Sequence, residues 1–400
     1  LTSLESPSLA EVGGILAIAQ NDVLTSLSFP SLSSVGDDLS LTTSLALASL
    51  TMPSLSEVRG DLLVRGTGLV SLSLPVLTSV EGNLSVDKDA ALTSIGLPLL
   101  SSIGGWLVAI DNAAIASFDL PALATVGDYF QVQGNAALDS FELPALTSVG
   151  ELFKVSNNDA LAALDLPSLA SVGGELEVSS CEALSTVALP SIASLGGRLV
   201  VRDNAGLTAL DLSSPAPMGG LRLYVRNNGA LAGLDLSMFT EIGDLTVDDN
   251  AALTTLDLSA LSSMVSSLTV TNNGALASLD LSVLTSMGGG FSLHALALPV
   301  LELPELTELG GGLVVQHCDE LPSIEFPKLT SVGSYLQIAA NDSLASFGLH
   351  ALASVGAALT MTDNAALARC LVDDLVEQIQ AAQGIGGSIT RHSNNANCTC

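Results

Sequence analysis

The sequence predicts an all-β fold, a parallel solenoid of about sixteen 23-residue coils closed by a short C-terminal helical cap. A small apolar residue, usually followed by glycine, recurs at intervals of 22 to 24 residues. Apolar residues alternate within each interval, and asparagine returns at one fixed place. A unit of this length buries its apolar row only by stacking on its neighbours, which is typical of a solenoid. The recurring residues are Val12, Val35, Val58, Val80, Ile103, Val126, Val149, Val172, Leu195, Met218, Ile242, Met264, Met287, Leu309, Val332 and Val355.

The coil from Val172 to Leu195 shows how each element is predicted. With Val172 as position 0, apolar residues fall at positions 4 and 6, then at 12, 15 and 17, and then at 20 and 23. Spacings of two predict short strands with alternate residues inward. Proline recurs at position 18, as in Pro190, where its missing N–H suits a corner better than a strand centre. Glycine at positions 1 and 2 suits a tight corner and a close approach of the next coil.

Position 9 holds the recurring asparagine. An inward asparagine at a bend can bond backbone groups that the turn leaves unpaired. Cys181 and Cys318 occupy the same position, where cysteine acts as a small buried residue with a weak donor. The asparagines are Asn21, Asn112, Asn135, Asn158, Asn204, Asn228, Asn250, Asn273, Asn341 and Asn364.

With this position the sequence resembles the leucine-rich-repeat family, whose pattern is LxxLxLxxN/CxL, and more closely the receptor L-domain family. Good instances are GDLTVDDNAALTTLDL (243–258) and GSYLQIAANDSLASF (333–347). The resemblance covers residues 1–369 and implies a right-handed solenoid of parallel strands. It also implies a secreted or cell-surface protein, in the manner of bacterial and fungal surface members. Leu296 departs from the pattern, so we expect local distortion over 291–304.

Residues 370–400 are predicted to form a separate cap. Leu371, Leu375 and Ile379 fall on one helical face, and Gly384 can end that helix near residue 383. Three cysteines lie here, and a disulfide from Cys370 to Cys398 or Cys400 would favour an oxidising compartment. Reduced thiols in a cytosolic tail, or a zinc site, are the alternatives.

The charge of the chain argues against nucleic acid as a partner, and the positions of its acids predict an acidic edge. With 41 acidic and 11 basic residues, the net charge of −30 repels nucleic acid. No apolar run reaches the roughly 20 residues of a membrane helix, so we expect no membrane-spanning segment. Acids recur at position 16, where they predict a solvated acidic edge or, as a weaker alternative, loose Ca²⁺ binding; no other cofactor is expected. They are Asp119, Glu142, Asp165, Asp211, Asp235, Asp257, Asp280, Glu302 and Glu325.

The outward positions 3, 5 and 7 of one strand vary from coil to coil. They collect the only tryptophan, the tyrosines and most of the basic residues, which are enriched at binding hot spots. The alternative interpretation is that the arginines neutralise acids of the same chain. The candidate ligand-binding residues are Lys154, Arg198, Arg202, Arg222, Tyr224 and Arg226, extended by Trp106 and Tyr129.

These observations predict a non-catalytic extracellular or cell-surface protein that binds a protein or a glycan through the variable face. The runner-up is a structural subunit of a filament or surface layer. Leu1 enters a repeat halfway, so either the chain is a processed product or a capping segment lies upstream; an uncapped N-terminal edge could then self-assemble. Ice binding by the Ser/Thr positions is a remote alternative, because Ala and Glu interrupt them.

No catalytic residues are predicted. Among the outward acids only Asp244 and Asp248 share a coil, and no histidine or lysine pairs with them as an acid–base partner. His294 and His317 fall on adjacent coils near Cys318. That cysteine should point inward, so no metal site is expected from the three residues.

Overall fold

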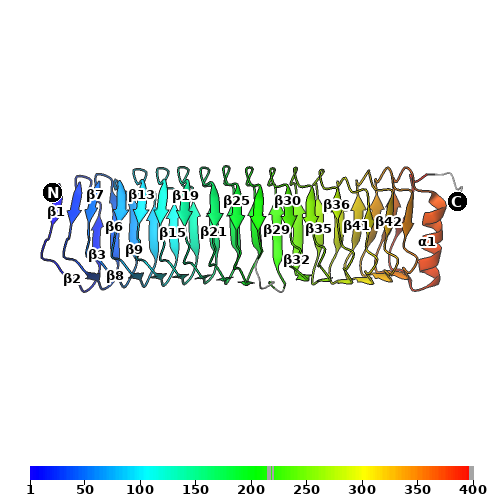
Figure 1. The fold of residues 1–400 in the computed structure, drawn as a ribbon, viewed down its shortest axis with the longest axis horizontal. Helices are drawn as coiled ribbons and strands as arrows, with labels where there is room; N and C mark the ends of the chain where they lie inside the picture. The colour runs from blue at the N-terminus through cyan, green and yellow to red at the C-terminus, as the bar shows by residue number, and fades with distance from the viewer. Residues whose placement is uncertain (214–217, 219, 396–400) are drawn as a thin grey trace. The chain divides into compact units, whose positions relative to one another are not determined.

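The computed structural model describes residues 1–213, 218 and 220–395. It divides into two compact units, unit 1 (1–216) and unit 2 (217–400), and each is treated by itself. Within each unit, successive coils stack side by side, and their equivalent strands pair in parallel (Figure 1). Every predicted coil contributes one long strand, so the predicted parallel solenoid is confirmed.

The long strands of each unit pair in sequence order into one parallel sheet, called here the long sheet. In unit 1 the strands are β3 (Leu16–Ala19), β6 (Leu39–Ser44), β9 (Leu62–Thr67), β12 (Leu84–Asp87), β15 (Leu107–Ile110), β18 (Phe130–Gln133), β21 (Phe153–Ser156), β24 (Leu176–Ser179) and β27 (Leu199–Arg202). In unit 2 they are β29 (Arg222–Arg226), β32 (Asp244–Asp248), β35 (Leu268–Thr271), β38 (Phe291–His294), β41 (Leu313–Gln316), β44 (Leu336–Ala339), β47 (Leu359–Thr362) and β49 (Ile389–Thr390).

Two further sides complete each coil. Two-residue strands end at the recurring apolar residue, from β2 (Glu11–Val12) to β26 (Ser194–Leu195) in unit 1 and from β31 (Glu241–Ile242) to β48 (Gly384–Ile385) in unit 2. Strands of two or three residues form the third side, from β1 (Ser3–Glu5) to β28 (Ala209–Asp211) and from β30 (Gly233–Asp235) to β45 (Ser346–Gly348). Both sides were predicted from the alternating apolar positions.

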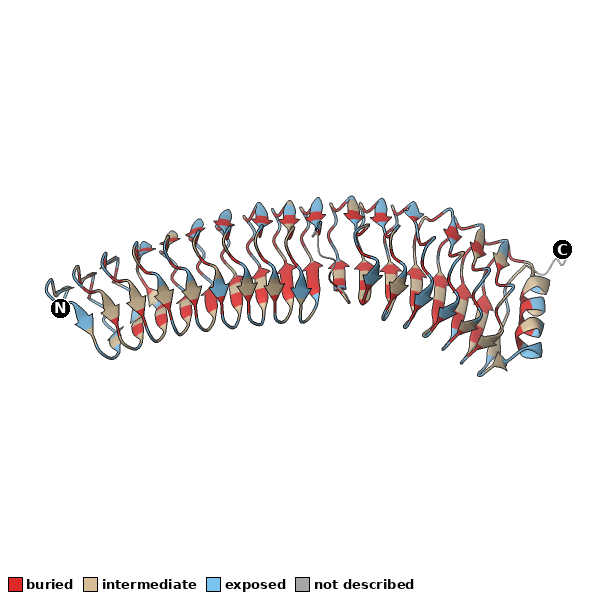
Figure 2. Ribbon diagram, turned by 60° about the horizontal axis from the view of Figure 1, so that its bottom comes forward, coloured by how far each residue is buried: buried red, intermediate tan, exposed pale blue. Residues whose placement is uncertain are grey.

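The register places like residues beside like residues, coil after coil. Phe130 pairs with Phe153, and their rings stack with centroids 4.8 Å apart. Alternate residues of the long strands are buried, which Figure 2 shows as red bands across the arrows. In the first coil the inward Leu16 and Ile18 are only half-buried. The core of each unit is therefore a thin stack of Leu, Val, Ile and Phe layers.

A left-handed residue ends each long strand, directly before position 9. At Ala340, for example, φ is 54° and at His317 it is 53°. Gly66 and Gly134 supply glycine at this point, and seven other coils supply Asn or Asp, which also tolerate such a φ. The remaining coils place Gln, Thr, Lys, Ser, Ala or His there. The bend therefore uses the left-handed region whatever the side chain, because the stacked coils on either side hold it.

Position 9 forms a ladder of asparagines through the interior. The Oδ1 atom of Asn135 accepts the backbone N–H of Asn112 at 3.0 Å, and its Nδ2 atom donates to the carbonyl of Ala109 at 3.0 Å. Asn158 makes the same two bonds to Asn135 and Val132. Each asparagine therefore completes the bend of the preceding coil, which is the role that the sequence predicts for it.

Cysteine reproduces with sulfur the bond from the backbone N–H of the preceding coil, but it donates within its own coil. The Sγ atom of Cys181 accepts the backbone N–H of Asn158 and donates to the carbonyl of Ser179 at 3.5 Å. Cys318 does the same with Leu296 and Gln316. Burial raises the pKa of both thiols to about 11. A protonated thiol can both donate and accept, so it fits the ladder in a way that a thiolate would not.

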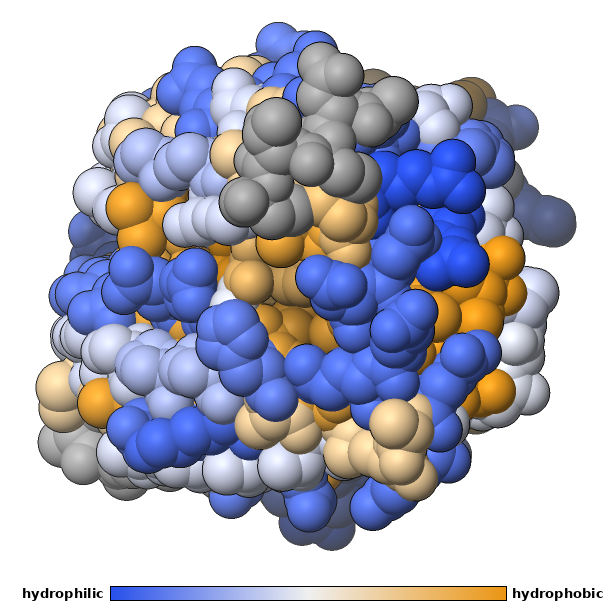
Figure 3. Space-filling view, turned by 90° about the vertical axis from the view of Figure 1, so that its right-hand side faces the viewer, coloured by the Kyte–Doolittle hydropathy of each residue, from blue (hydrophilic) through white to orange (hydrophobic). Residues whose placement is uncertain are grey.

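The C-terminal cap begins with helix α1 (Arg369–Ala381), which confirms the predicted helix two residues earlier than expected. Val372, Leu375, Val376 and Ile379 are buried. Gln378 donates to the carbonyls of Leu349 and Leu352, and β48 and β49 extend the two neighbouring sheets. Figure 3, which looks onto this end, shows mainly hydrophilic side chains with smaller hydrophobic areas between them.

The cap also continues the asparagine ladder, which the sequence did not predict. Asn394 accepts the backbone N–H of Asn364 at 3.2 Å and donates to the carbonyl of Met361 at 2.7 Å. The predicted partners of Cys370, which are Cys398 and Cys400, lie outside the described residues. No helix among the described residues is long and apolar enough to cross a membrane.

Candidate functional site

The outward face of the long sheet in unit 1 carries a group of paired charges, called here the Glu177 cluster (Lys154, Glu177, Ser179, Arg202 and Asp203). Lys154 on β21 lies beside Glu177 on β24 in register. The Lys154 Nζ atom is 2.8 Å from Glu177 Oε2, and an Arg202 guanidinium nitrogen is 2.8 Å from Oε1. Ser179 donates to Oε1 at 2.9 Å, and Arg202 also pairs with Asp203 at 2.7 Å.

Glu177 is the centre of this cluster, because cations contact it from both sides. Although it points outward, only 7% of the residue is exposed. Burial alone would raise the pKa of its carboxyl, but hydrogen bonds from Lys154 and Ser179, followed by the charge of Lys154 and a bond from Arg202, lower it below its usual value. Glu177 is therefore ionised at neutral pH, and the cluster holds its side chains in one arrangement.

An aromatic pair lies on the same outward face. Trp106 directly precedes β15 and Tyr129 directly precedes β18, and their rings stack with centroids 5.3 Å apart and planes 12° apart. Both residues are half-buried. Burial, then the charges of Asp128 and Asp87, raise the pKa of Tyr129. Because the rings stack on each other along the coils, they present edges as well as faces to a ligand.

Arg198, directly before β27, differs from the other cations of unit 1. Its side chain is exposed, and no ion pair within 1–213 involves it. Lys154 and Arg202 are half-buried, whereas Arg198 is open to solvent at the end of the same strand as Arg202. Of the predicted cations in unit 1, Arg198 is the one whose charge is available to a partner.

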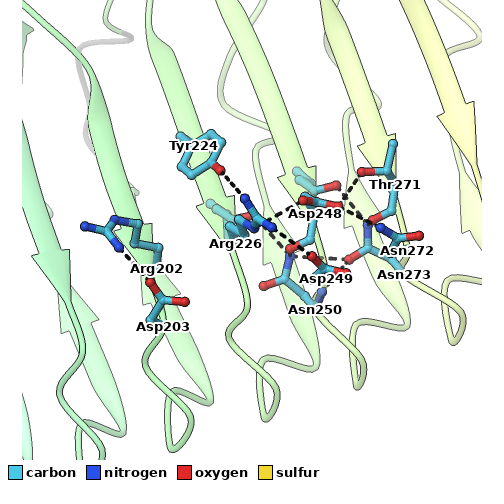
Figure 4. Close-up of polar contacts among 12 residues, drawn as sticks. Arg202, Asp203, Tyr224, Arg226, Asp248, Asp249, Asn250, Thr271, Asn272 and Asn273 are labelled. Atoms are coloured by element: carbon cyan, nitrogen blue, oxygen red, sulfur yellow. Dashed lines mark hydrogen bonds and ion pairs between the residues drawn. The ribbon is translucent and has the colours of Figure 1, made fainter.

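In unit 2 the predicted residues gather on β29. Arg226 lies opposite Asp248 in register, with its Nε atom 3.3 Å from Asp248 Oδ2, and a second guanidinium nitrogen is 3.5 Å from Asp249 (Figure 4). The same guanidinium donates to the Tyr224 hydroxyl at 3.3 Å. Arg222 is exposed at the other end of the strand. Asp248 also accepts from Thr271 on the next coil (Figure 4).

The predicted site residues therefore fall into two groups, one in each unit. The structure brings together Lys154 with Arg202 through Glu177, Trp106 with Tyr129, and Tyr224 with Arg226. The ion pairs agree with the alternative in which basic residues neutralise acids of the same chain. Sequence reasoning missed Glu177 itself, although its separation of 23 residues from Lys154 places both at the same outward position.

On the other faces, many hydroxyl and carboxyl groups are already bonded to the backbone or to side chains of the same chain. Thr147 donates its hydroxyl to the carbonyl of Ala124 at 3.0 Å, one coil back, and Thr285 donates to Ser262 at 2.9 Å. In the acidic row of unit 2, Asp235 accepts from the backbone and hydroxyl of Ser237, which holds the pKa of that carboxyl below its usual value. These repeated residues hold corners and neighbouring coils together.

The arrangement of His, Cys, Asp and Glu side chains in residues 1–213, 218 and 220–395 bears on metal binding and on acid–base catalysis. No group of three or more His, Cys, Asp or Glu side chains is placed to hold a metal ion there. The outward acids Asp244 and Asp248 accept hydrogen bonds from the next coil, from the Ser267 backbone and the Thr271 hydroxyl respectively.

Comparison with solved structures gives distant matches, two of which are described below. No protein-family model and no curated protein matches the chain. A leucine-rich repeat protein from Bacteroides ovatus ATCC 8483 is 12% identical, with 77% of this chain and 80% of that chain covered and a TM-score of 0.40. The structure of a TLR13–ssRNA13 complex gives 14% identity, 92% and 85% coverage and a TM-score of 0.21. The predicted parallel solenoid is shown by the strand pairing of this chain itself.

Proposed function

We propose that this protein is a non-catalytic recognition scaffold, secreted or held at a cell surface, which binds a protein partner through the outward face of its long sheet. The observation that carries this proposal is the contrast between faces. The outward face of unit 1 gathers Trp106, Tyr129 and the exposed Arg198 around the Glu177 cluster. Other faces repeat small residues whose hydroxyls already bond the preceding coil.

The arrangement of this face suits a protein partner. Lys154, Glu177 and Arg202 hold one another, so little side-chain freedom is lost when a partner covers them. Trp106 and Tyr129 supply rigid apolar area. Arg198, which has no ion pair within 1–213, supplies a charge that can bond a carboxylate of the partner. Because the two aromatic rings stack on each other, fewer ring faces remain for sugars than on an open platform, which favours protein over glycan.

The proposal of a secreted or cell-surface protein draws on the predicted cap. A disulfide from Cys370 to Cys398 or Cys400 would form and persist in an oxidising compartment. The large excess of acidic residues keeps a repetitive chain soluble outside the cell as well as within it. Mass spectrometry of the cap is therefore part of the test of location.

The test uses the purified full chain as bait on intact cells of its source, with cross-linking and identification of captured proteins. The wild type is compared with Arg198→Glu and Trp106→Ala, and with Lys328→Glu as the control, since Lys328 is an exposed cation that pairs with Glu305 in unit 2. We expect the two outward-face variants to lose a partner that the control retains. Equal capture by all four proteins would refute the proposal. If the chain bound glycans on an array and captured no protein, the ligand would be a glycan and the proposal of a protein partner would be wrong.

A further inference from the structure

Two histidines on the outward face of unit 2 lie in contact on neighbouring coils. His294 is the last residue of β38, and His317 follows β41 directly. Their ring centroids are 4.9 Å apart and the ring planes meet at 66°. His317 is exposed and His294 is half-buried, so both imidazoles can be reached from solvent.

The separation of the rings matches that of two imidazoles on one metal ion. With metal–nitrogen bonds of about 2.0–2.1 Å, two rings bound at angles between square and tetrahedral have centroids about 4.5–5.2 Å apart. The observed 4.9 Å lies inside this interval. The spacing of the two rings is therefore compatible with both binding one ion once the side chains rotate to turn a nitrogen of each toward it.

The ring nitrogens are available as ligands. Within residues 220–395, neither imidazole makes a hydrogen bond to another protein group, in contrast to His392, which bonds the Ser393 hydroxyl. The neighbours of His294 in register are Thr271 and Gln316, which are neutral. No cation therefore occupies the adjacent strand positions to repel a metal ion.

The electrostatic setting favours a cation. Asp319 and Glu320 lie two and three residues after His317 and are exposed. The chain as a whole carries a net charge of −30, which raises the local concentration of divalent ions. Imidazole selects transition metals over Ca²⁺ and Mg²⁺, which prefer oxygen.

We propose that His294 and His317 together bind one divalent transition-metal ion, Zn²⁺ or Cu²⁺, with water completing its coordination. Sequence reasoning rejected a metal here because Cys318 points inward, and the structure does place its thiol in the asparagine ladder. The histidine pair does not need that thiol. The protein supplies two ligands, so the ion is exchangeable and is not a structural centre.

The experiment titrates Zn²⁺ into the full chain by calorimetry, without reductant. Binding by His294→Gln and His317→Asn is compared with that of the wild type. Both substitutions suit their positions, because Gln316 occupies the same strand position as His294 and asparagine tolerates the left-handed backbone of His317. His350→Gln is the matched control, since the chain has only four histidines. Circular dichroism confirms that each variant is folded.

We expect one ion per chain whose affinity falls at least tenfold in either pair variant and is unchanged in His350→Gln. Electron paramagnetic resonance of bound Cu²⁺ should show coupling to two imidazole nitrogens, reduced to one in each pair variant. Zn²⁺ binding that survives in both pair variants, or a Cu²⁺ spectrum without two nitrogens, would overturn the proposal.

Discussion

Asn394 in the cap completes the bend of the coil that contains Asn364, with its side chain bonded both to the backbone N–H of Asn364 and to the carbonyl of Met361. Asn394 lies 30 residues after Asn364 instead of 23, because the chain makes helix α1 in between. The cap therefore covers the end of the core with a helix and also satisfies the last polar bend. This pair shows that the bend before the cap is satisfied in the same way as the bends between interior coils that carry asparagine.

Replacing Asn135 or Asn158 with Leu should destabilise the fold by about 1–3 kcal/mol, because buried backbone groups of the preceding bend lose their partners. Denaturant unfolding measures the loss, and hydrogen exchange locates it in the coil before the mutation. Asp159→Ala, at the exposed neighbour of Asn158, is the control. Equal losses in the control and the ladder variants would contradict the assigned role of the asparagines.

Asp89→Asn should stabilise unit 1 at neutral pH. Asp89 occupies a ladder position with no exposed surface, accepts the N–H and hydroxyl of Thr67, and leaves Oδ2 without a partner. Asparagine would offer a donor at that atom, as Asn112 does toward Val86. The expected gain is about 1–3 kcal/mol, the cost of one unsatisfied buried acceptor.

This gain should depend on pH in a defined direction. Burial raises the pKa of the Asp89 carboxyl above its unfolded value, so the stability it contributes is complete below the unfolded pKa and is lost as the pH rises through the folded one. The advantage of Asp89→Asn should therefore shrink toward pH 4 and grow toward pH 7.5. Melting temperatures at both pH values test it, with Asp159→Asn to correct for the loss of one charge.

Cys181 and Cys318 should resist alkylation in the folded protein. The thiolate is the reactive form, and burial raises the pKa of both thiols to about 11. Iodoacetamide at pH 8 should label neither residue until the chain is denatured, and peptide mass spectrometry reads the result. Rapid labelling of either one in the native state would contradict its place in the ladder.

The same mass spectra, taken without reductant, test the cap. We expect Cys370 to be joined to Cys398 or Cys400. Substituting Cys370 with Ser should then loosen the last coils before the middle ones, because stability in a solenoid depends on nearest neighbours. Free thiols at all three positions would refute the disulfide.

Arg202→Glu should lower the stability of unit 1, whereas Arg198→Glu should not. Arg202 balances the largely buried Glu177, and its reversal brings carboxylates together at a cost of about 1–2 kcal/mol, held down by the solvent exposure of the guanidinium. Arg198 has no ion pair within 1–213. Thermal unfolding of the two variants gives the comparison, and equal melting temperatures would contradict the structural role of Arg202.

The repeat, the inward strands and the asparagine position could be predicted because burial imposes one residue type on them. The left-handed residue before each asparagine could not, because its side chain points to solvent and is as varied as Lys88, His317 and Ala340. Asn394 could not be predicted, because helix α1 interrupts the 22- to 24-residue spacing of the asparagines. In the candidate site the cations stood out against an acidic chain, whereas Glu177, one acid among many, is distinguished only by its neighbours in register.

The asparagine ladder has a direction, so the first and the last coil differ in the hydrogen-bond partners that they require. Since the asparagine of each coil serves the bend of the coil before it, a coil finishes its own bend only when the next one is in place. Removing coils from the N-terminal side leaves the asparagine bonds of the remaining coils in place. Removing the segment that carries Asn394 leaves the bend of the coil with Asn364 without its partner. During synthesis, the bend of the most recently folded coil would therefore stay incomplete until the next coil folds. The segment that carries Asn394 completes the bend of the coil before it.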